Sequence, residues 1–239
     1  MYPWTERTQL LLGEENTQLL RQSHILVVGL GGVGAYLAES LCRAGIGKLT
    51  LADGDEIKPS NINRQLLALH STIGSPKAEL LKIRLKDINP TIELSIISDY
   101  LRDERLKDLV EKPYDYVADA IDTLSPKLFL LADAVKYGHR IVSSMGAGGR
   151  IHPEKIRVAD ISQTFNCPLA LLLRKRLRKQ GIYSGIKAVF SEETIIEGSQ
   201  IWVEDEPNKK TTVGTLSYMP AFFGLFMASV IIRDLIKPV

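Results

Sequence analysis

A glycine-rich segment stands out near the N-terminus, with the sequence Gly29-Leu30-Gly31-Gly32-Val33-Gly34. It fits the pattern G-x-G-x-x-G between an apolar run and a helical segment. Glycines in such a loop let the backbone turn sharply and approach a phosphate, and the N-terminus of the following helix supplies free N–H donors and partial positive charge. Asp53 comes at the end of the next expected strand, where a carboxylate can accept hydrogen bonds from ribose hydroxyls. The pattern predicts nucleotide binding without distinguishing NAD from ATP.

Polar residues downstream favour ATP. They are Asp55, Asn61, Arg64, Gln65 and Lys77. Arg64 and Lys77 can place two positive charges near a triphosphate, which suits a reaction in which pyrophosphate leaves and charge builds up on phosphoryl oxygens. A single cation of this kind is usually a solvated surface residue. The combination of Arg64 and Lys77 with Asn61 and the glycine segment makes a purely solvated role improbable. We find no group of residues suited to hydride transfer, which a dehydrogenase would need.

A further carboxylate, Asp122, lies just beyond the end of another expected strand. Ligands of open α/β sheets bind beyond the carboxyl ends of the strands. A carboxylate at this place can hold Mg²⁺ that bridges phosphates. The alternative is that Asp122 caps the helix that follows.

Alternating strands and helices are expected to bring these residues together. Apolar runs predict strands at 25–28, 48–52, 92–97, 114–118 and 140–143. Helical spacing predicts helices at 35–43, 77–88 and 126–136, and Ser125 is the expected N-cap of the last. Alternation of this kind predicts an α/β fold, Rossmann-like, with a doubly wound and mostly parallel sheet. We expect a single domain with a C-terminal extension packed on it.

The second half of the chain changes in pattern. We expect strands at 151–158 and 186–190, a basic helix at 168–180 and a polar surface loop at 191–212. Residues 218–232 are apolar but fall short of the roughly 20 residues that span a bilayer, so a buried core helix is the better interpretation and no membrane insertion is expected. Residues 1–12 do not have the pattern of a secretory signal.

The chain has two cysteines, Cys42 and Cys167, and no CxxC pair, so a four-cysteine zinc site is excluded. Two such distant cysteines do not make a disulfide scaffold, and the expected compartment is the reducing cytoplasm. Cys42 is expected to be a small core residue. Cys167 is expected at the start of the basic helix, where a thiolate would be somewhat acidified, so a reactive role stays open beside a structural one.

The net charge of +2, from 30 basic and 28 acidic residues, gives no sign of a polyanionic partner. Residues 161–191, however, contain no acidic residue. The basic helix in this stretch carries five cations, Arg174, Lys175, Arg176, Arg178 and Lys179. Its apolar side is expected to consist of Leu169, Leu172, Leu173 and Leu177. A solvated face is the usual role of a charge run, but the single sign favours contact with the phosphate backbone of a nucleic acid.

Together these motifs resemble the adenylating superfamily that includes ThiF, MoeB and HesA and is related to ubiquitin-activating enzymes. The resemblance covers residues 5–149 and rests on Arg7-Thr8-Gln9-Leu10-Leu11-Leu12-Gly13, the glycine segment, Asp53-x-Asp55, Ser60-Asn61-x-x-Arg64-Gln65, Pro76-Lys77 and Asp119-x-x-Asp122. It implies an enzyme that binds ATP and Mg²⁺ and adenylylates a carboxylate.

The same resemblance implies roles for single residues. Asp53 would hold the ribose, Asp122 would hold Mg²⁺, and the phosphates would be held by Asn61, Arg64 and Lys77. Members of the family are homodimers, so Arg7 would reach the phosphates bound by the partner subunit. The implied organisation is one adenylating domain over 1–239, with a dimer-exchange segment at 1–22, an ATP-binding core at 23–150, and a half facing substrate and tRNA at 151–239 that contains a flexible loop at 192–212.

The second half is similar to one branch of this superfamily, the tRNA threonylcarbamoyladenosine dehydratases (TcdA). The similar motifs are Asp119-Ala120-Ile121-Asp122-Thr123-x-Ser125-Pro126-Lys127, Gly146-Ala147-Gly148-Gly149-Arg150, the segment 164–178, and Val189-Phe190-Ser191-x-Glu193. The implied reaction is ATP-dependent cyclisation of N6-threonylcarbamoyladenosine in tRNA. ATP activates the carboxylate as an acyl adenylate, and the carbamoyl group of the nucleoside closes the ring and releases AMP. One departure is Cys167, where this branch is expected to have Asp.

Three other functions stay open at this point. The first is adenylation of the C-terminus of a sulfur-carrier or ubiquitin-like protein, against which the missing zinc pairs and the basic helix count. The second is an NAD-dependent oxidoreductase, and the third is a nucleotide-binding scaffold without catalysis. Docking of a sulfur-transfer protein also stays open.

Overall fold

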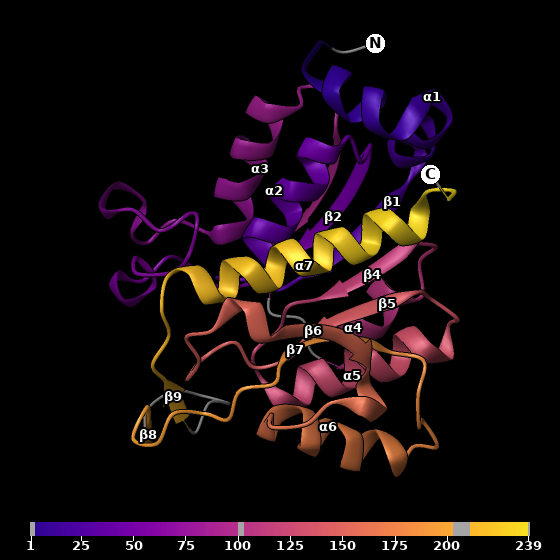
Figure 1. The fold of residues 1–239 in the computed structure, drawn as a ribbon. Coiled ribbons are helices and arrows are strands. Elements are labelled where there is room, and N and C mark those ends of the chain that lie inside the picture. Colours follow the sequence, from indigo (N-terminus) through magenta and orange to yellow (C-terminus); the bar gives the residue numbers. More distant parts are fainter. Residues whose placement is uncertain (1–2, 100–102, 203–210, 239) are drawn as a thin grey trace.

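The computed structural model describes residues 3–99, 103–202 and 211–238, and its ribbon is shown in Figure 1. Within these ranges one seven-stranded sheet has the order β3-β2-β1-β4-β5-β7-β6. The strands are β1 (His24–Val28), β2 (Lys48–Ala52), β3 (Glu93–Ile97), β4 (Tyr116–Asp119), β5 (Ile141–Ser144), β6 (Ile156–Asp160) and β7 (Lys187–Ser191). The pairs are parallel except for β6 with β7. The doubly wound, mostly parallel α/β fold is confirmed, because the chain builds outward from β1 in both directions.

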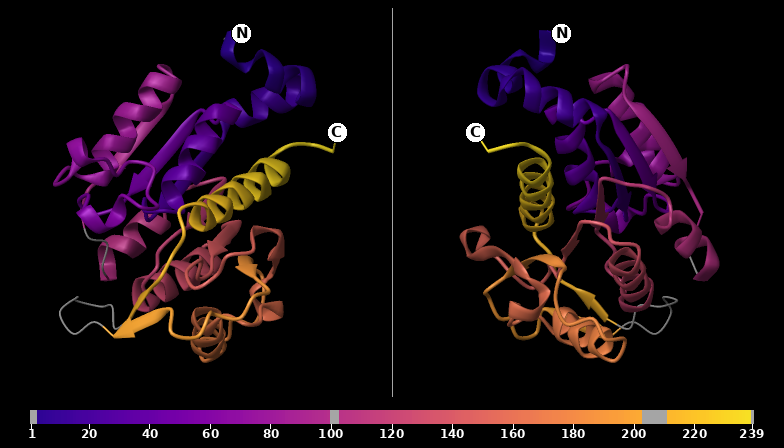
Figure 2. Two further views of the ribbon diagram at one scale, coloured as in Figure 1. Left: turned by 60° about the vertical axis from the view of Figure 1, so that its left-hand side comes forward. Right: turned by 90° about the vertical axis from the view of Figure 1, so that its right-hand side faces the viewer.

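Helices cover both faces of the sheet, as Figures 1 and 2 show. They are α1 (Glu6–Gln22), α2 (Gly34–Ala44), α3 (Lys77–Ile88), α4 (Asp103–Val110), α5 (Leu124–Lys136), α6 (Pro168–Arg178) and α7 (Tyr218–Leu235). Ile25 and Val27 of β1 belong to the core under α2, α3 and α7, whereas Leu26 and Val28 belong to the core under α4, α5 and α6. Alternate residues of one strand thus serve two apolar layers, which explains why β1 is continuously apolar.

The start of α5 differs from the sequence prediction. The helix begins at Leu124 with Thr123 as the N-cap residue, so Ser125 is not the N-cap. Pro126 therefore occupies the third helical position rather than the first. The physical reason is that the first N–H groups of a helix have no partner inside it, so proline is tolerated throughout the first turn and does not fix the boundary to one residue.

Two predictions for the second half were also wrong. The strand expected at 151–158 is confined to β6, because Pro153 lacks an N–H and lies in a 3-10 turn at Pro153–Lys155. The expected loop at 191–212 contains an antiparallel pair, β8 (Gln200–Trp202) and β9 (Thr211–Val213). Residues 203–210 of the expected flexible loop lie outside the described residues.

Helix α7 is long and apolar enough to cross a membrane by length and composition alone. It buries Phe223, Gly224 and Met227 against the rest of the chain, and its main helical neighbour is α2. The interpretation as a core helix is therefore confirmed.

Gly224 is where α7 approaches α2 most closely. A Cβ on Gly224 would lie 2.4 Å from the carbonyl oxygen of Val33 and 3.0 Å from the amide nitrogen of Leu37. We expect Gly224→Ala to lower the free energy of unfolding by about 1–2 kcal/mol, because overpacking costs up to about 3 kcal/mol and alanine regains about 1 kcal/mol as a helix former. Urea unfolding measures this. Ser229→Ala on the exposed side of α7 is the control and should change stability by less than about 0.5 kcal/mol. Equal stabilities would contradict this packing.

Helix α1 lies beside the end of α7, near both termini (Figure 1). It contains a kink at Gly13, where φ is +80°. The Asn16 side chain joins the two chain ends, because its Oδ1 accepts a 2.8 Å hydrogen bond from the backbone N–H of Lys237. Gly47, just before β2, donates to the carbonyl of Leu20. The C-terminal part of α1 is thereby fixed at the amino ends of the strands.

Candidate functional site

The glycine segment forms a tight loop between β1 and α2. Gly29 has φ +88°, and a Cβ on it would lie 2.8 Å from the backbone of Ala120. A Cβ on Gly34 would lie 1.7 Å from the carbonyl oxygen of Gly29. Side chains at either position would disrupt the loop, so both glycines are required by geometry. The N-terminus of α2 has no side-chain cap from any described residue, and the N–H of Ala35 donates to the carbonyl of Gly31 within the loop.

Asp53 connects this loop with the end of β2. Its Oδ2 accepts a 2.6 Å hydrogen bond from the N–H of Leu30, and its Oδ1 accepts a 2.8 Å bond from the N–H of Asp55. Burial raises the pKa of Asp53, and the neighbouring Lys77 acts in the opposite direction. Each carboxylate oxygen keeps a second lone pair, so Asp53 can hold the loop and still accept a hydrogen bond from a ribose hydroxyl.

Lys77 lies at the start of α3 with its side chain only 6% exposed. Its Nζ makes a 2.8 Å ion pair with Oδ2 of Asp55. A lysine held at this depth by one carboxylate keeps two N–H donors for other acceptors, and the Asp55 partner fixes where they lie. Hydrogen bonds and this ion pair thus link Asp53, Asp55 and Lys77 to the glycine loop.

The segment from Ser60 to Gln65 covers the other side of the loop. Asn61 is buried and its Oδ1 accepts from the N–H of Lys58, so this side chain stabilises the segment itself. Arg64 donates through Nη1 to the carbonyl of Ser60 at 2.8 Å and to Oδ1 of Asn63 at 2.9 Å. Both residues therefore have local partners, and Arg64 keeps further N–H donors.

Gln65 is the clearest sign of a ligand at this edge. Its Nε2 would lie 3.5 Å from a Cβ on Gly31, which places the amide against the glycine loop. Its Oε1 is buried and accepts no hydrogen bond from any described residue. A buried acceptor without a donor is costly, so a donor group on a bound molecule would complete it. The loop and the free acceptor together fit a nucleotide.

Asp122 is exposed in the turn between β4 and α5. Thr123 is the N-cap residue of α5, so Asp122 is not the helix cap. The described residues contain no group of three or more side chains able to bind a metal. Mg²⁺ commonly binds through one or two carboxylates with water and substrate phosphates. Asp122 near a triphosphate fits that donor set, and a protein-only metal site is not needed.

Arg7 is not brought to this site within one chain. It is an exposed residue in the first turn of α1, and the neighbouring Thr5 accepts a hydrogen bond from Arg21 at the end of α1 that lies beside the amino ends of the strands. The glycine loop follows the carboxyl end of β1 at the opposite edge. Within one protomer, Arg7 and the loop are therefore separated by the length of the strands.

The basic helix α6 differs in part from its prediction. Arg174 donates from Nη1 to the carbonyl oxygen of Thr164 at 2.5 Å and is partly buried, so it holds the segment before α6 and is not a free surface cation. Leu172 is 44% exposed, and the buried side consists of Ala170, Leu173 and Leu177. The buried face is therefore shifted from the one that the leucine pattern indicated, because Ala170 packs inward in place of Leu172. The exposed cations are Lys175, Arg176, Arg178 and Lys179.

The two cysteines are buried. Cys42 belongs to the core beside α2 and α3, and burial raises its pKa to about 12. Its prediction as a core residue is confirmed. Cys167 is 5% exposed at the N-cap position of α6, and its Sγ would lie 3.7 Å from a Cβ on Gly146. It packs beneath the loop that follows β5.

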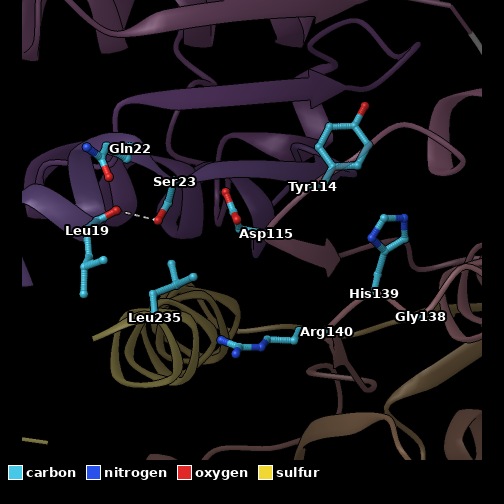
Figure 3. A pocket seen from close by; sticks show the side chains of 9 residues that line it. All are labelled: Leu19, Gln22, Ser23, Tyr114, Asp115, Gly138, His139, Arg140 and Leu235. Atoms are coloured by element: carbon cyan, nitrogen blue, oxygen red, sulfur yellow. Dashed lines mark hydrogen bonds between the residues drawn. The ribbon is translucent and has the colours of Figure 1, made fainter. Parts of the chain in front are cut away.

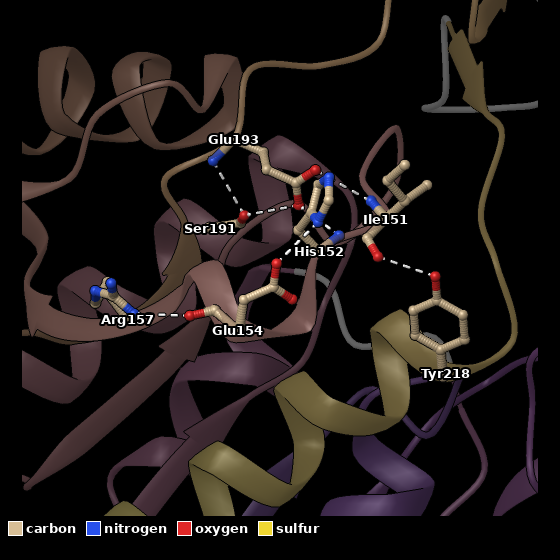
Figure 4. A network of polar contacts seen from close by, with 7 residues as sticks. All are labelled: Ile151, His152, Glu154, Arg157, Ser191, Glu193 and Tyr218. Atoms are coloured by element: carbon tan, nitrogen blue, oxygen red, sulfur yellow. Dashed lines mark hydrogen bonds and ion pairs between the residues drawn. The ribbon is translucent and has the colours of Figure 1, made fainter.

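Residues beside this loop were missed as site candidates. Arg150 is buried and donates to the carbonyl oxygens of Gly146, Gly148 and Asn166. Glu193 accepts from the backbone N–H groups of Ile151 and His152, and the nearby Tyr218 hydroxyl donates to the Ile151 carbonyl (Figure 4). These contacts join the loop after β5 to α6 and α7. Arg150 belongs to the glycine-rich motif at 146–150, but sequence alone gives no sign that its partners are backbone carbonyls.

A second group of polar residues that the sequence did not indicate is buried beneath the turn that carries Asp122. Asp119 and Lys127 are both 0% exposed, with 2.6 Å between Oδ2 and Nζ. The Ser143 hydroxyl donates to the same Oδ2 at 2.6 Å. Burial raises the pKa of Asp119, whereas the donors around it favour the charged carboxylate. The sequence feature that could have indicated this group is Lys127, a lysine within a largely apolar helical pattern.

A cavity of about 430 Å³ lies at the opposite edge of the sheet. Ser23, Tyr114, His139 and Arg140 are among the residues that line it (Figure 3). None of the predicted site residues takes part. The predicted nucleotide residues gather at the carboxyl edge instead, Arg7 excepted.

Comparison with known proteins agrees with this geometry. The chain is 36% identical over 240 residues to tRNA threonylcarbamoyladenosine dehydratase of Bacillus subtilis, covering 98% of this chain and 94% of the relative. It is 40% identical over 230 residues to the enzyme of the same name from Haemophilus influenzae, covering 91% and 87%. The crystal structure of Escherichia coli tRNA N6-threonylcarbamoyladenosine dehydratase in complex with ATP matches with a TM-score of 0.86 and 34% identity, over 96% of this chain and 92% of that one.

A sequence model of the ThiF family matches residues 6–238. This range includes the glycine loop, both carboxylates at the end of β2, the Asp122 turn and the basic helix. The resemblance seen in the motifs is confirmed, and the chain belongs to the ThiF family.

Proposed function

We propose that this chain is an enzyme that uses ATP to dehydrate N6-threonylcarbamoyladenosine in tRNA to its cyclic form. The observation that carries the proposal is the extent of the similarity. Relatives with this activity match 98% and 91% of the chain, so the likeness includes the second half as well as the nucleotide edge. The ATP complex of the Escherichia coli relative supports ATP as the nucleotide, and the free acceptor of Gln65 fits a bound nucleotide.

The proposed reaction has two steps. The carboxylate of the threonylcarbamoyl group attacks the α-phosphorus of ATP, and pyrophosphate leaves with formation of a mixed anhydride with AMP. The carbamoyl group of the same nucleoside then attacks the activated carbonyl carbon, and AMP leaves as the ring closes. One water is lost from the nucleoside overall, its oxygen leaving on AMP. The enzyme needs no nucleophile, which agrees with two buried cysteines.

The chain's own residues contribute position and charge in this scheme. The glycine loop and the N-terminus of α2 receive phosphate oxygens, and Asp53 accepts from the ribose. Lys77 and Arg64 offset the negative charge that grows on the leaving pyrophosphate. When bound, Mg²⁺ would neutralise phosphate charge, and Asp122 is the residue proposed to hold it. Catalysis is then mainly orientation of two groups of one substrate.

The proposal also includes a homodimeric assembly and a cytoplasmic location. A homodimer would bring Arg7 of one protomer to the phosphates bound by the other, which accounts for its distance from the loop of its own chain. The described cations of α6 would contact the tRNA backbone, and α6 begins beside the loop after β5, next to the proposed site. A cytoplasmic location agrees with a tRNA substrate. A sulfur-transfer protein stays a further candidate partner with no contact surface assigned to it.

The test is direct incubation of the protein with ATP, Mg²⁺ and tRNA that carries threonylcarbamoyladenosine. Nucleoside mass spectrometry should record loss of one water, together with release of AMP and pyrophosphate. Omission of ATP is the control. Unchanged nucleoside with release of pyrophosphate on addition of a sulfur-carrier protein would favour the alternative, adenylation of a carrier C-terminus. Stabilisation by NAD and not by ATP would favour an oxidoreductase.

A further inference from the structure

A pair of opposite charges is fully buried next to the proposed metal ligand. Asp119 ends β4 and Lys127 lies near the start of α5, and both side chains are 0% exposed. Taking two charges out of water carries a large desolvation cost, and an apolar pair of similar size is often as stable or more stable. A gain in stability is therefore a weak explanation for the burial of these two charges. The hydrogen bonds that the pair makes with its neighbours supply a better explanation.

The pair engages both polar backbone groups of one residue, Ile121. The N–H of Ile121 donates to Oδ1 of Asp119 at 3.1 Å. The carbonyl oxygen of Ile121 accepts from Nζ of Lys127 at 2.9 Å. The Ser143 hydroxyl on β5 donates to Asp119 at 2.6 Å and fixes the carboxylate from the neighbouring strand. The peptide groups on either side of Ile121 are thus held from a strand, a helix and a second strand.

The braced turn meets the glycine loop on one side and carries Asp122 on the other. Ala120, just before Ile121, donates from its N–H to the carbonyl of Val28 and lies against Gly29 and Gly34. Asp122 follows Ile121 directly. The distance between the phosphate loop and the Asp122 carboxylate therefore depends on the conformation of Ile121.

We propose that Lys127, through its ion pair with Asp119, is a positioning residue that orients the Asp122 turn toward ATP and its metal ion. This inference rests on the proposed function for the identity of the ligand. It assigns no contact with substrate to Lys127, which is enclosed by protein. It assigns to the pair the task of holding one carboxylate at a fixed place beside the glycine loop.

The experiment uses the full chain and the double variant Asp119→Asn/Lys127→Met. Removing both charges avoids an unpaired buried ion, and methionine fills the lysine volume but cannot donate to Ile121. Calorimetry measures ATP affinity with and without Mg²⁺. We expect the gain in ATP affinity on adding Mg²⁺ to fall by about 10- to 100-fold, as with other supports of metal ligands, while affinity for ATP alone stays unchanged. In tRNA turnover, kcat should fall together with the Mg²⁺ dependence.

Two variants serve as references. Lys127→Arg keeps the charge and several N–H donors, so it should restore most of the Mg²⁺-dependent gain. Lys136→Met is the same substitution at an exposed position of α5 and should leave both affinities as in the wild type. Thermal unfolding of each variant shows whether the fold is retained.

A folded double variant with a wild-type gain on adding Mg²⁺ would overturn the inference. If the double variant fails to fold, Asp119→Asn/Lys127→Leu decides, because leucine also removes the donor to Ile121 but is a smaller side chain; a full wild-type gain in that variant would overturn the inference equally. A wild-type protein that binds ATP with Mg²⁺ but leaves the modified tRNA unchanged would contradict the proposed function alone. The ATP-binding comparison would still decide the role of Lys127.

Discussion

Asp122→Ala is expected to lower turnover of ATP with the modified tRNA by about 100-fold or more, the range seen when one preorganised electrostatic contact to the reacting group is removed. The carboxylate is exposed beyond β4 and Thr123, not Asp122, is the N-cap residue of α5, so its removal leaves the apolar core intact. Stability should change by less than about 0.5 kcal/mol. Pyrophosphate release, AMP release and nucleoside mass spectrometry measure the activity, and thermal unfolding measures the stability.

The matched control is Asp108→Ala on α4, another exposed aspartate that lies away from the carboxyl edge. It should leave turnover unchanged. A second check is the Mg²⁺ concentration that gives half-maximal rate, which should rise in Asp122→Asn because an amide is a weaker ligand for a hard cation. Turnover of Asp122→Ala equal to that of the control would refute the assigned role.

The sequence was sufficient for the nucleotide edge because that edge is made of short local patterns. Gly29 and Gly34 are required by their own backbone and near neighbours, and Asp53 follows from the end of a strand that alternation already located. In a doubly wound sheet the carboxyl ends of β1, β2 and β4 are adjacent, so three separate motifs predict one site. That part of the prediction depends on topology and needs no knowledge of side-chain packing.

The remaining features depend on contacts between residues distant in sequence. Arg174 was expected to face solvent, but it donates to Thr164, ten residues earlier. The partners of Lys127 come from the end of β4 and from β5, so its burial becomes visible only once the strands are assembled. The start of α5 was misplaced for a different reason, since Ser125 and Pro126 are both compatible with the first turn at more than one position. Local propensity cannot choose between such registers.

The family resemblance also suggests why Arg7 lies far from the glycine loop of its own chain. The resemblance implied that Arg7 serves a partner subunit, and within one chain the contact of the neighbouring Thr5 with Arg21 places it at the other edge of the sheet. Its role stays a prediction. If the partner's site uses it, Arg7→Ala should lower activity in a protein that still forms dimers.

Reversing the charges of α6 is expected to weaken tRNA binding strongly and to reduce its dependence on salt. The triple variant Lys175→Glu, Arg176→Glu and Arg178→Glu changes three exposed cations and leaves Arg174 in place, because Arg174 holds Thr164. Removing one cation–phosphate interaction lowers the slope of log affinity against log salt by about 0.7–0.9, so the slope should fall by about 2–3 if all three residues bind phosphates. Filter binding or fluorescence anisotropy over a series of salt concentrations measures both quantities.

The same variant separates binding of tRNA from chemistry. The three residues lie on the outer face of a helix whose buried side is formed by Ala170, Leu173 and Leu177, so the fold should be kept. We expect a higher KM for tRNA and an unchanged kcat and ATP affinity, because backbone contacts position the substrate without reading its bases. The control reverses Lys107, Lys112 and Lys136, three exposed lysines outside α6, with the same change of net charge. An equal loss of affinity in the two triple variants would show that net charge alone, and not this helix, attracts the tRNA.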